Sequence, residues 1–396
     1  MLAIWLKGDR GMYDFDNGVK RRGTNCIKWD VPFVKEDVLP MWIADMDYRV
    51  APAITENLER IIEQGAFGYQ FLSEQYYQSV INWMERRHGY HLEREEICFV
   101  PNVVVGLAYA VQTIANPGDE LIVQTPAYGP FFGVIKDNRC KIVENPLKNN
   151  NGYYTMDLKD LESKITKKTK AVIICNPHNP SGRVWTENEL SDLAEVCIRH
   201  NLYILSDDIH SELISKGNKH TFISGLSEEI RNRSFIFTSP SKAFNLAGIH
   251  LANCFIADER LRKKFMEQKS KFHAGENSSF VEAALTGAYD KSEEWLIEVN
   301  EYIDDNLNYF VQEIQKYMPK LTVFKPEGTY LVWVDFRRTS IEPQQLQQYL
   351  LEECKIATNA GDFFGKEGEG FARFNLACPR STVVEAVKRL KVKFAN

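Results

Sequence analysis

The segment TSPSKAFN at residues 238–245 places a lysine and two serines directly after an apolar, strand-like run. Lys242 is preceded by Ser239 and Ser241, three and one residues earlier. A lysine amine can form a Schiff base with an aldehyde, and serine hydroxyls can donate to a phosphate. Lysines after serine-rich turns are often only solvated loop residues. The segment is therefore a candidate anchor for pyridoxal phosphate (PLP) if other segments supply the rest of a site.

A second candidate segment, NPHNPSG at residues 176–182, follows the apolar run 171–175. Prolines on either side of Asn179 fix the backbone there and can aim the side-chain amide at a ligand. Such an amide can donate to the phenolic oxygen of PLP. The composition is also that of a rigid turn, but a turn alone does not explain the position at the end of a strand.

A third candidate is SDDIH at residues 206–210, at the end of another apolar strand. A carboxylate there can pair with the pyridine nitrogen of PLP and keep the ring protonated, so that it accepts electrons. Asp208 competes for this role, but Asp207 has the same strand parity as Leu205 and is favoured. His210 can face the same pocket, although a single histidine is more often structural.

Two further segments complete the set. The run VPNVVVG at residues 100–106 predicts the start of a helix with Asn102 as its cap. The first backbone amides of that helix, those of Val103 and Val104, can bind phosphate, although an ordinary capped helix has the same pattern. Tyr128 follows a further predicted strand and can stack on a pyridine ring.

The bulk properties narrow the class of protein. A chain of 396 residues favours two domains. A net charge of −6 without a basic block does not favour nucleic acid, and the longest apolar runs are only strand length, so no membrane span is predicted. Eight scattered cysteines without a Cys-x-x-Cys pair predict free thiols in a reducing, cytoplasmic compartment, and no metal site is predicted.

From about residue 100 to 260, strand-like and helix-like segments alternate, which predicts an α/β fold with a mostly parallel sheet and helices on both faces. Helices are expected over 103–115 and 186–200. The predicted strands span 120–124, 140–146, 171–176, 202–207, 234–238 and 252–257. Ligands bind at the carboxyl ends of such strands, where the candidate site residues fall.

After residue 258 the pattern becomes α+β and predicts a second, smaller domain. Its expected elements are a charged helical stretch over 259–317, strands at 321–324, 329–335 and 370–376, and helices at 342–354 and 381–394. The predicted division is a large domain at 48–290 and a small domain formed by 12–47 and 291–396. Residues 1–11 are expected to be an N-terminal extension or a cloning remnant.

The order of these segments resembles the fold-type I PLP enzymes, the aspartate aminotransferase superfamily, from about residue 12 onward. Four motifs further resemble the MalY/PatB branch of cystathionine β-lyases: PMWIADMD at 40–47, SDDIH at 206–210, GTYL at 328–331 and RFNLACPR at 373–380. The resemblance implies a fold-type I PLP-dependent transferase fold, with a mostly parallel seven-stranded sheet in the large domain and a smaller α+β domain.

The resemblance also implies roles for residues. The cofactor contacts it implies are the Schiff-base lysine Lys242, the pyridinium partner Asp207, Asn179 at the phenolic oxygen, Tyr128 on the ring, His210, and the phosphate ligands Val103, Val104, Ser239 and Ser241. Arg373 would clamp the carboxylate of an amino-acid substrate, with Ala44 and Asn179 beside it. Tyr69 would reach the phosphate of a neighbouring subunit, which implies a homodimer with shared sites.

The implied activity is a PLP-dependent C–S β-lyase, in which Lys242, Asp207 and Tyr128 are the catalytic residues. Two other functions remain open: an aminotransferase, and a regulatory binding protein on the same fold. Two residues depart from the aminotransferase pattern. His210 stands where those enzymes usually have a tyrosine, and His250 stands where many of them have a phosphate-binding arginine.

Overall fold

The computed structural model describes residues 11–272 and 277–395. Within these ranges the larger sheet has seven strands in the order β2-β10-β9-β8-β7-β3-β4. In that order they span Ile97–Val100, Ala252–Phe255, Ser234–Thr238, Tyr203–Asp207, Thr169–Cys175, Glu120–Thr125 and Lys141–Pro146. Only β10 runs antiparallel to its neighbours β2 and β9, so the predicted mostly parallel α/β fold is confirmed.

Alternate residues of each strand pack on opposite faces of this sheet, so both faces are buried. Ile173 and Leu205 lie in a cluster with α4 (Val103–Ile114), α5 (Pro130–Asp137) and α10 (Glu259–Lys271). Val172 and Ile204 lie in a second cluster on the other face, with α7 (Glu187–Arg199) and α3 (Glu74–His88). Helices on both faces explain why these strands read as continuous apolar runs in the sequence.

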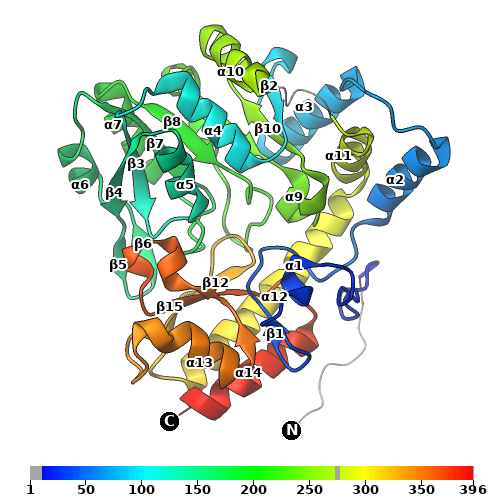
Figure 1. Cartoon of the computed structure of the whole chain (residues 1–396), viewed down its shortest axis with the longest axis vertical. Helices are drawn as coiled ribbons and strands as arrows, with labels where there is room; N and C mark the ends of the chain where they lie inside the picture. The colour runs from blue at the N-terminus through cyan, green and yellow to red at the C-terminus, as the bar shows by residue number, and fades with distance from the viewer. Residues whose placement is uncertain (1–10, 273–276, 396) are drawn as a thin grey trace.

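A second, antiparallel sheet of four strands forms the other part of the described chain, in the order β11-β12-β15-β14. These strands span Thr322–Val323, Leu331–Asp335, Phe371–Asn375 and Asn359–Ala360. The helices α12 (Glu293–Tyr317), α13 (Leu346–Glu352) and α14 (Arg380–Phe394) accompany it in the lower part of the molecule (Figure 1). The predicted α+β character of this region is confirmed.

The observed elements differ from the predicted ones mainly in the boundaries of helices and in short segments. The helical stretch 259–317 consists of α10, α11 (Ser279–Lys291) and α12. Asp258 caps α10 by accepting from the amide of Leu261.

Several elements are not predicted from the sequence because they are short or partly exposed. They are α1 (Ile27–Asp30), β1 (Leu39–Pro40), α2 (Pro52–Gln64), α3, β2, β5 (Lys148–Asn150), β6 (Tyr153–Thr155), α5, α6 (Leu158–Ser163), α8 (Glu228–Arg231), α9 (Pro240–Ala243), β13 (Ile356–Ala357) and β14.

The N-terminal segment packs against the C-terminal part of the chain, as expected. β1 pairs in parallel with β13, and the amide of Asn375 donates to the carbonyl of Met41 at 2.9 Å. The domain boundaries themselves stay a prediction. Residues 1–10 lie outside the described residues, as does most of the predicted extension 1–11.

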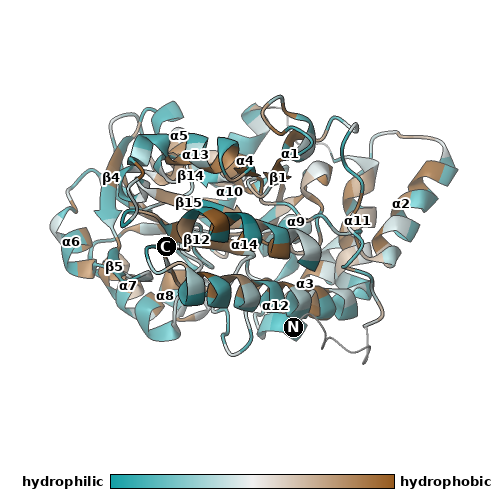
Figure 2. Ribbon diagram, turned by 90° about the horizontal axis from the view of Figure 1, so that it is seen from below, coloured by the Kyte–Doolittle hydropathy of each residue, from teal (hydrophilic) through white to brown (hydrophobic). Residues whose placement is uncertain are grey.

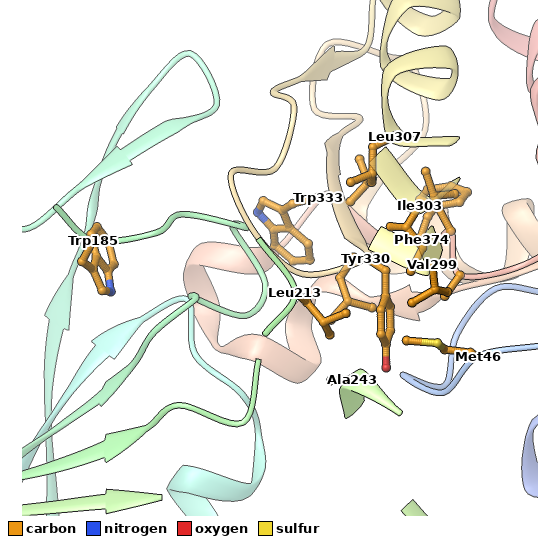
Figure 3. Close-up of a cluster of buried hydrophobic side chains, with 14 of the residues drawn as sticks. Met46, Trp185, Leu213, Ala243, Val299, Ile303, Leu307, Tyr330, Trp333 and Phe374 are labelled. Atoms are coloured by element: carbon orange, nitrogen blue, oxygen red, sulfur yellow. The ribbon is translucent and has the colours of Figure 1, made fainter. Parts of the chain in front are cut away.

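Apolar side chains join the two sheets around Tyr330. Figure 3 shows Tyr330 with its hydroxyl directed toward Met46 and Ala243, and with Leu213 beside it. All four side chains are at least 98 % buried. The peripheral helices, such as α8, carry hydrophilic residues on their outer sides (Figure 2). No helix in the described part of the chain is long and apolar enough to cross a membrane.

Candidate active site

The carboxyl ends of four neighbouring strands bring most of the predicted site residues to one edge of the larger sheet. β3, β7, β8 and β9 are consecutive in that sheet. Tyr128 follows β3, Asn179 follows β7, Asp207 ends β8, and Lys242 lies in α9 directly after β9. The convergence predicted from the positions of these residues after strands is confirmed.

The Lys242 amine donates to the backbone carbonyl of Ala44 at 2.7 Å. Burial, and then the charge of Arg373, lower the pKa of this amine to about 8, while Asp45 and Asp207 oppose the shift. A lysine with a pKa near neutrality is partly uncharged under physiological conditions and can act as a nucleophile or as a base. The lysine singled out from the sequence therefore has the acidity that this chemistry needs.

Asp207 is a buried carboxylate without a cationic side chain among its hydrogen-bond partners in the described residues. Its Oδ1 accepts from the amide of Ile209 at 3.2 Å. Burial, with a smaller contribution from Asp208, raises the pKa of the Asp207 carboxyl to about 7. A buried carboxylate in this state gains most from a buried cation, such as a protonated ring nitrogen.

Asp208 faces a different environment, as strand parity predicts. Its Oδ1 lies 3.1 Å from Nε2 of His220, and burial raises the pKa of its carboxyl to about 8. Leu205, two residues before Asp207, belongs to the cluster that contains α4, whereas Ile204 belongs to the opposite cluster. Asp207 therefore projects on the face where α4 begins, and Asp208 projects away from it.

Arg373 on β15 is 4 % exposed and is held by neutral acceptors. One terminal nitrogen donates to Oδ1 of Asn179 at 3.0 Å, and the other donates to the carbonyl of Trp42 at 2.9 Å and to Oδ1 of Asn359 at 2.5 Å. Burial lowers the pKa of the guanidinium to about 10. A buried guanidinium with neutral partners is well suited to bind the carboxylate of a ligand.

Tyr128 and His210 belong to the same set of side chains as Lys242, Asp207, Asn179 and Arg373. This set is here called the central group. The Tyr128 ring packs edge-on against Phe131 and Phe363, with centroid distances of 5.7 and 6.2 Å. Burial raises the pKa of the Tyr128 hydroxyl, and the charges of Arg373 and Asp207 act on it in opposite directions. Burial, followed by the charges of Lys242 and Arg373, lowers the pKa of His210 far below its usual value, so its ring is neutral.

The residues predicted to bind the phosphate lie at the starts of two helices: Val103 and Val104 in α4, and Ser239 and Ser241 at α9. Asn102 caps this helix by accepting from the amide of Val105 at 2.9 Å, as predicted. The amides of Val103 and Val104 precede the first intrahelical bond and point out of the helix end. Ser239 caps α9 and donates its hydroxyl proton to the carbonyl of Leu251 at 2.5 Å, so its donation to a phosphate requires that bond to break.

Two residues are not brought to this group within the chain. Tyr69 lies between α2 and α3 and is 90 % exposed, next to Phe67 at 60 % and Phe71 at 87 %. This position agrees with a role in another subunit, which stays a prediction. His250 is exposed and follows a short 3-10 turn. The backbone φ of His250 is 58°.

The structure adds site residues that sequence patterns do not reveal. Asn359 orients Arg373 but lies in the two-residue strand β14, where no motif marks it. Asn375 donates to the carbonyls of Ile43 and Asp45, both at 2.6 Å, and so fixes the loop that holds Ala44. The sequence signal that could have identified Asn375 is its position two residues after Arg373, in the sequence RFN.

Comparisons with known proteins agree with this geometry. The model of the aminotransferase class I and II family matches residues 37–390. This chain belongs to that family. Cystathionine β-lyase PatB of Bacillus subtilis is 38 % identical and covers 96 % of this chain and 99 % of its own. Protein MalY of Escherichia coli is 30 % identical, with coverage of 96 and 98 %.

A solved structure gives the same result for the fold. Cystalysin from Treponema denticola, in a crystal structure that contains a pyridoxal 5'-phosphate cofactor, superposes with a TM-score of 0.93. It is 32 % identical, and the match covers 96 % of this chain and 98 % of that one. The fold-type I fold and the relation to the MalY/PatB branch, both expected from the motifs, are confirmed.

Proposed function

We propose that this protein is a PLP-dependent C–S β-lyase that cleaves cystathionine or other cysteine conjugates. With cystathionine and water, the products are homocysteine, pyruvate and ammonia. The observation that carries the proposal is the position of Lys242 directly after β9, where its amine donates to the carbonyl of Ala44 at 2.7 Å, and where burial and the charge of Arg373 lower its pKa to about 8. The 38 % identity to a cystathionine β-lyase supports the reaction type.

The described residues fit PLP. Asp207 is a buried carboxylate bonded to a backbone amide, which matches a protonated pyridine nitrogen. Two buried atoms in the central group, Nε of Arg373 and Nδ1 of His210, have no hydrogen-bond partner among the described residues. Buried polar atoms of this kind usually pair with a ligand or with water. The start of α4 supplies backbone amides and a favourable dipole for a phosphate.

Each residue then has a defined task. PLP, when bound, supplies the electron sink that stabilises negative charge at the substrate α-carbon. Lys242 would hold the cofactor through its side-chain nitrogen, and its amine would accept the proton from that carbon. Asp207 holds a proton on the ring nitrogen, and Arg373 binds the substrate carboxylate. Asn179 keeps an amide N–H₂ group available, because its Oδ1 accepts from Arg373.

Arg373 and Lys242 together fix the substrate in two places. The guanidinium binds the carboxylate, and the lysine stands near the amine and the α-carbon. Neither contact involves the β-substituent, so that group stays free to depart. The role of Tyr128 is to cover the ring face, since its side chain is half-buried beside the end of β3.

We also propose that the protein works as a homodimer in the cytoplasm. The exposed aromatic residues Phe67, Tyr69 and Phe71 form an apolar surface that a second copy would cover. Tyr69 from one copy would then serve the site of the other. All eight cysteines are free thiols, which is the usual state in a reducing compartment.

The product balance tests the proposal. The purified protein is loaded with PLP and incubated with cystathionine, and homocysteine, pyruvate and ammonia are quantified. We expect equal amounts of all three from the wild type and none above background from Lys242→Ala. Equal activity in Lys242→Ala would remove the central residue from the account, and an absence of pyruvate would contradict the lyase assignment.

A further inference from the structure

Two cations and two carboxylates form a group, here called the N-terminal ion cluster: Lys28 and Asp47, which are buried, and Arg21 and Asp45, which are partly buried. Lys28 is 1 % exposed, and its Nζ lies 2.8 Å from Asp47 and 3.4 Å from Asp45. Arg21 donates to both carboxylate oxygens of Asp45, at 2.9 and 2.6 Å, and lies 3.3 Å from Asp47. The formal charges balance, as buried ions require.

The loop at residues 42–47 that carries these carboxylates also carries acceptors for the active site. The carbonyl of Trp42 accepts from Arg373 at 2.9 Å, and the carbonyl of Ala44 accepts from Lys242 at 2.7 Å. The side chains of Asp45 and Asp47 point into the ion cluster instead. A displacement of the carboxylates therefore displaces the backbone acceptors of the lysine and the arginine.

Lys28 and Arg21 anchor this loop from the N-terminal side. Nζ of Lys28 also donates to the carbonyl of Asp45 at 3.2 Å, and Arg21 donates to that of Met46 at 3.1 Å. From the opposite side, Asn375 and Asn245 bond the same loop. Loss of one cation thus leaves the loop attached but allows it to shift.

One member of the cluster, Asp45, also acts on the Lys242 amine through its charge. The charged and titratable groups that act on this amine are Arg373 from β15, Asp207 from β8, Asp45 from the loop and His210 after β8. Asp45 raises the pKa of Lys242. Lys28 and Arg21 neutralise Asp45, so removal of Lys28 increases the effect of Asp45 on the amine.

We propose that Lys28 and Arg21 are positioning residues, which hold loop 42–47 so that its carbonyls meet Lys242 and Arg373. This inference rests on the proposed function, because the positioned groups are those of the lyase site. No sequence motif reveals this positioning role, because the two cations are far from Lys242 along the chain. Lys28 and Arg21 lie 214 and 221 residues before Lys242, in a segment with few regular elements.

The test uses the PLP-loaded full chain and Lys28→Met, which keeps an unbranched side chain as far as the position of Cε and removes the ammonium group. We expect kcat with cystathionine to fall about 10- to 100-fold, because small misplacements of reacting groups cost that much. We also expect the pH midpoint of the visible absorbance of the Lys242-bound cofactor to move to higher pH. Lys28→Arg should restore both properties in large part.

Lys269→Met is the matched control. Lys269 is also a buried lysine, 7 % exposed, whose Nζ donates to a backbone carbonyl, that of Phe99, at 2.8 Å. This variant should lower the melting temperature but leave kcat and the absorbance midpoint unchanged. If Lys28→Met does not fold, Arg21→Gln replaces it, because Arg21 is 22 % exposed and its loss is better tolerated.

The inference is overturned if the variant binds PLP and both its kcat and its midpoint equal those of the wild type. It is also overturned if Lys269→Met changes both properties equally. Failure of the proposed function gives a different result: the wild type itself would not eliminate a thiol. The absorbance midpoints of the PLP-bound variants would still decide the role of Lys28.

Discussion

The larger sheet and the N-terminal loop contribute to the same site by different means. Lys242, Asp207 and Asn179 stand at the ends of adjacent strands, where the order of the sheet alone brings them together. The carbonyls of Trp42 and Ala44 belong to an irregular loop, which buried ions and asparagine side chains hold in place. Regular structure thus places the reacting groups, and specific polar contacts place their acceptors.

The difference predicts how each region responds to mutation. A residue at a strand end can be replaced without moving the strand, so its loss removes chemistry and little else. A residue in the loop network acts through its neighbours, so its loss changes geometry and charge by degrees. The predictions below test this contrast, from the largest expected effect to the smallest.

Lys242→Ala should have the largest effect, because the residue both attaches the cofactor and moves a proton. We expect turnover to fall by about 10⁴-fold or more. In the wild type, borohydride reduction followed by peptide mapping should place the cofactor on Lys242, with Lys269 unlabelled as the control. A label on any other lysine would show that the strand-end assignment is wrong.

Asp207→Asn should lower kcat by about 10²- to 10³-fold, because its charge acts mainly when negative charge develops on the ring. Steady-state kinetics with cystathionine measure the effect. Asp208→Asn is the matched control and should be far milder, since its carboxylate lies 3.1 Å from His220 on the opposite side of the strand. An Asp207→Asn variant within about threefold of the wild type would count against the pairing with the ring nitrogen.

Arg373→Ala should chiefly raise KM, by about 10- to 100-fold, because a charged hydrogen bond to the carboxylate is lost. Arg373→Lys should rescue little, since a lysine lacks the two parallel donors. Asn359→Ala removes an acceptor of the guanidinium and should raise KM only a few-fold. Equal effects for Asn359→Ala and Arg373→Ala would show that the loss arises from general disorder of the region.

The last prediction concerns the stability of the protein without its cofactor and does not involve turnover. The folded-state pKa of Asp207 is raised from 3.8 to about 7, so the folded protein holds a proton that the unfolded chain releases. The free energy of unfolding of the wild type therefore falls, through this group, as the pH rises from about 4 to about 7. Cofactor-free Asp207→Asn lacks this penalty and should be the more stable protein at pH 8.

Urea unfolding at pH 4, 6 and 8 measures this difference. The stability gain of Asp207→Asn over the wild type should be smallest at pH 4, should grow up to about pH 7 and should then stay constant. With PLP bound, the wild type should be the more stable protein, because the carboxylate then has a cationic partner. A gain that does not depend on pH would contradict the burial of a titrating Asp207.

The strand-end residues could be predicted from the sequence because each follows an apolar run that forms a buried strand. Asp207 was distinguished from Asp208 by parity alone, and the structure places the two on opposite faces. Asn102 could also be recognised as a cap from the sequence, because local sequence determines local structure at the start of a helix. The family motifs then supplied roles that no local pattern contains.

The remaining features depend on contacts between distant segments. Nothing around Asn359 indicates that it orients Arg373, because β14 and β15 meet only in the folded sheet. Lys28 reads as an ordinary charged residue, and only the fold buries it between two carboxylates. Ser239 illustrates the converse: its sequence suggests a phosphate ligand, while its hydroxyl already bonds to Leu251.

The measurement that tests the account most directly is the number of turnovers per site with cystathionine as the sole substrate. Without a keto acid, a β-lyase regenerates its cofactor in every cycle, so we predict sustained release of pyruvate and thiol over many turnovers. An aminotransferase would stop after a single half-reaction. A burst of one turnover per site that resumes only when a keto acid is added would contradict the lyase function and leave the PLP site intact.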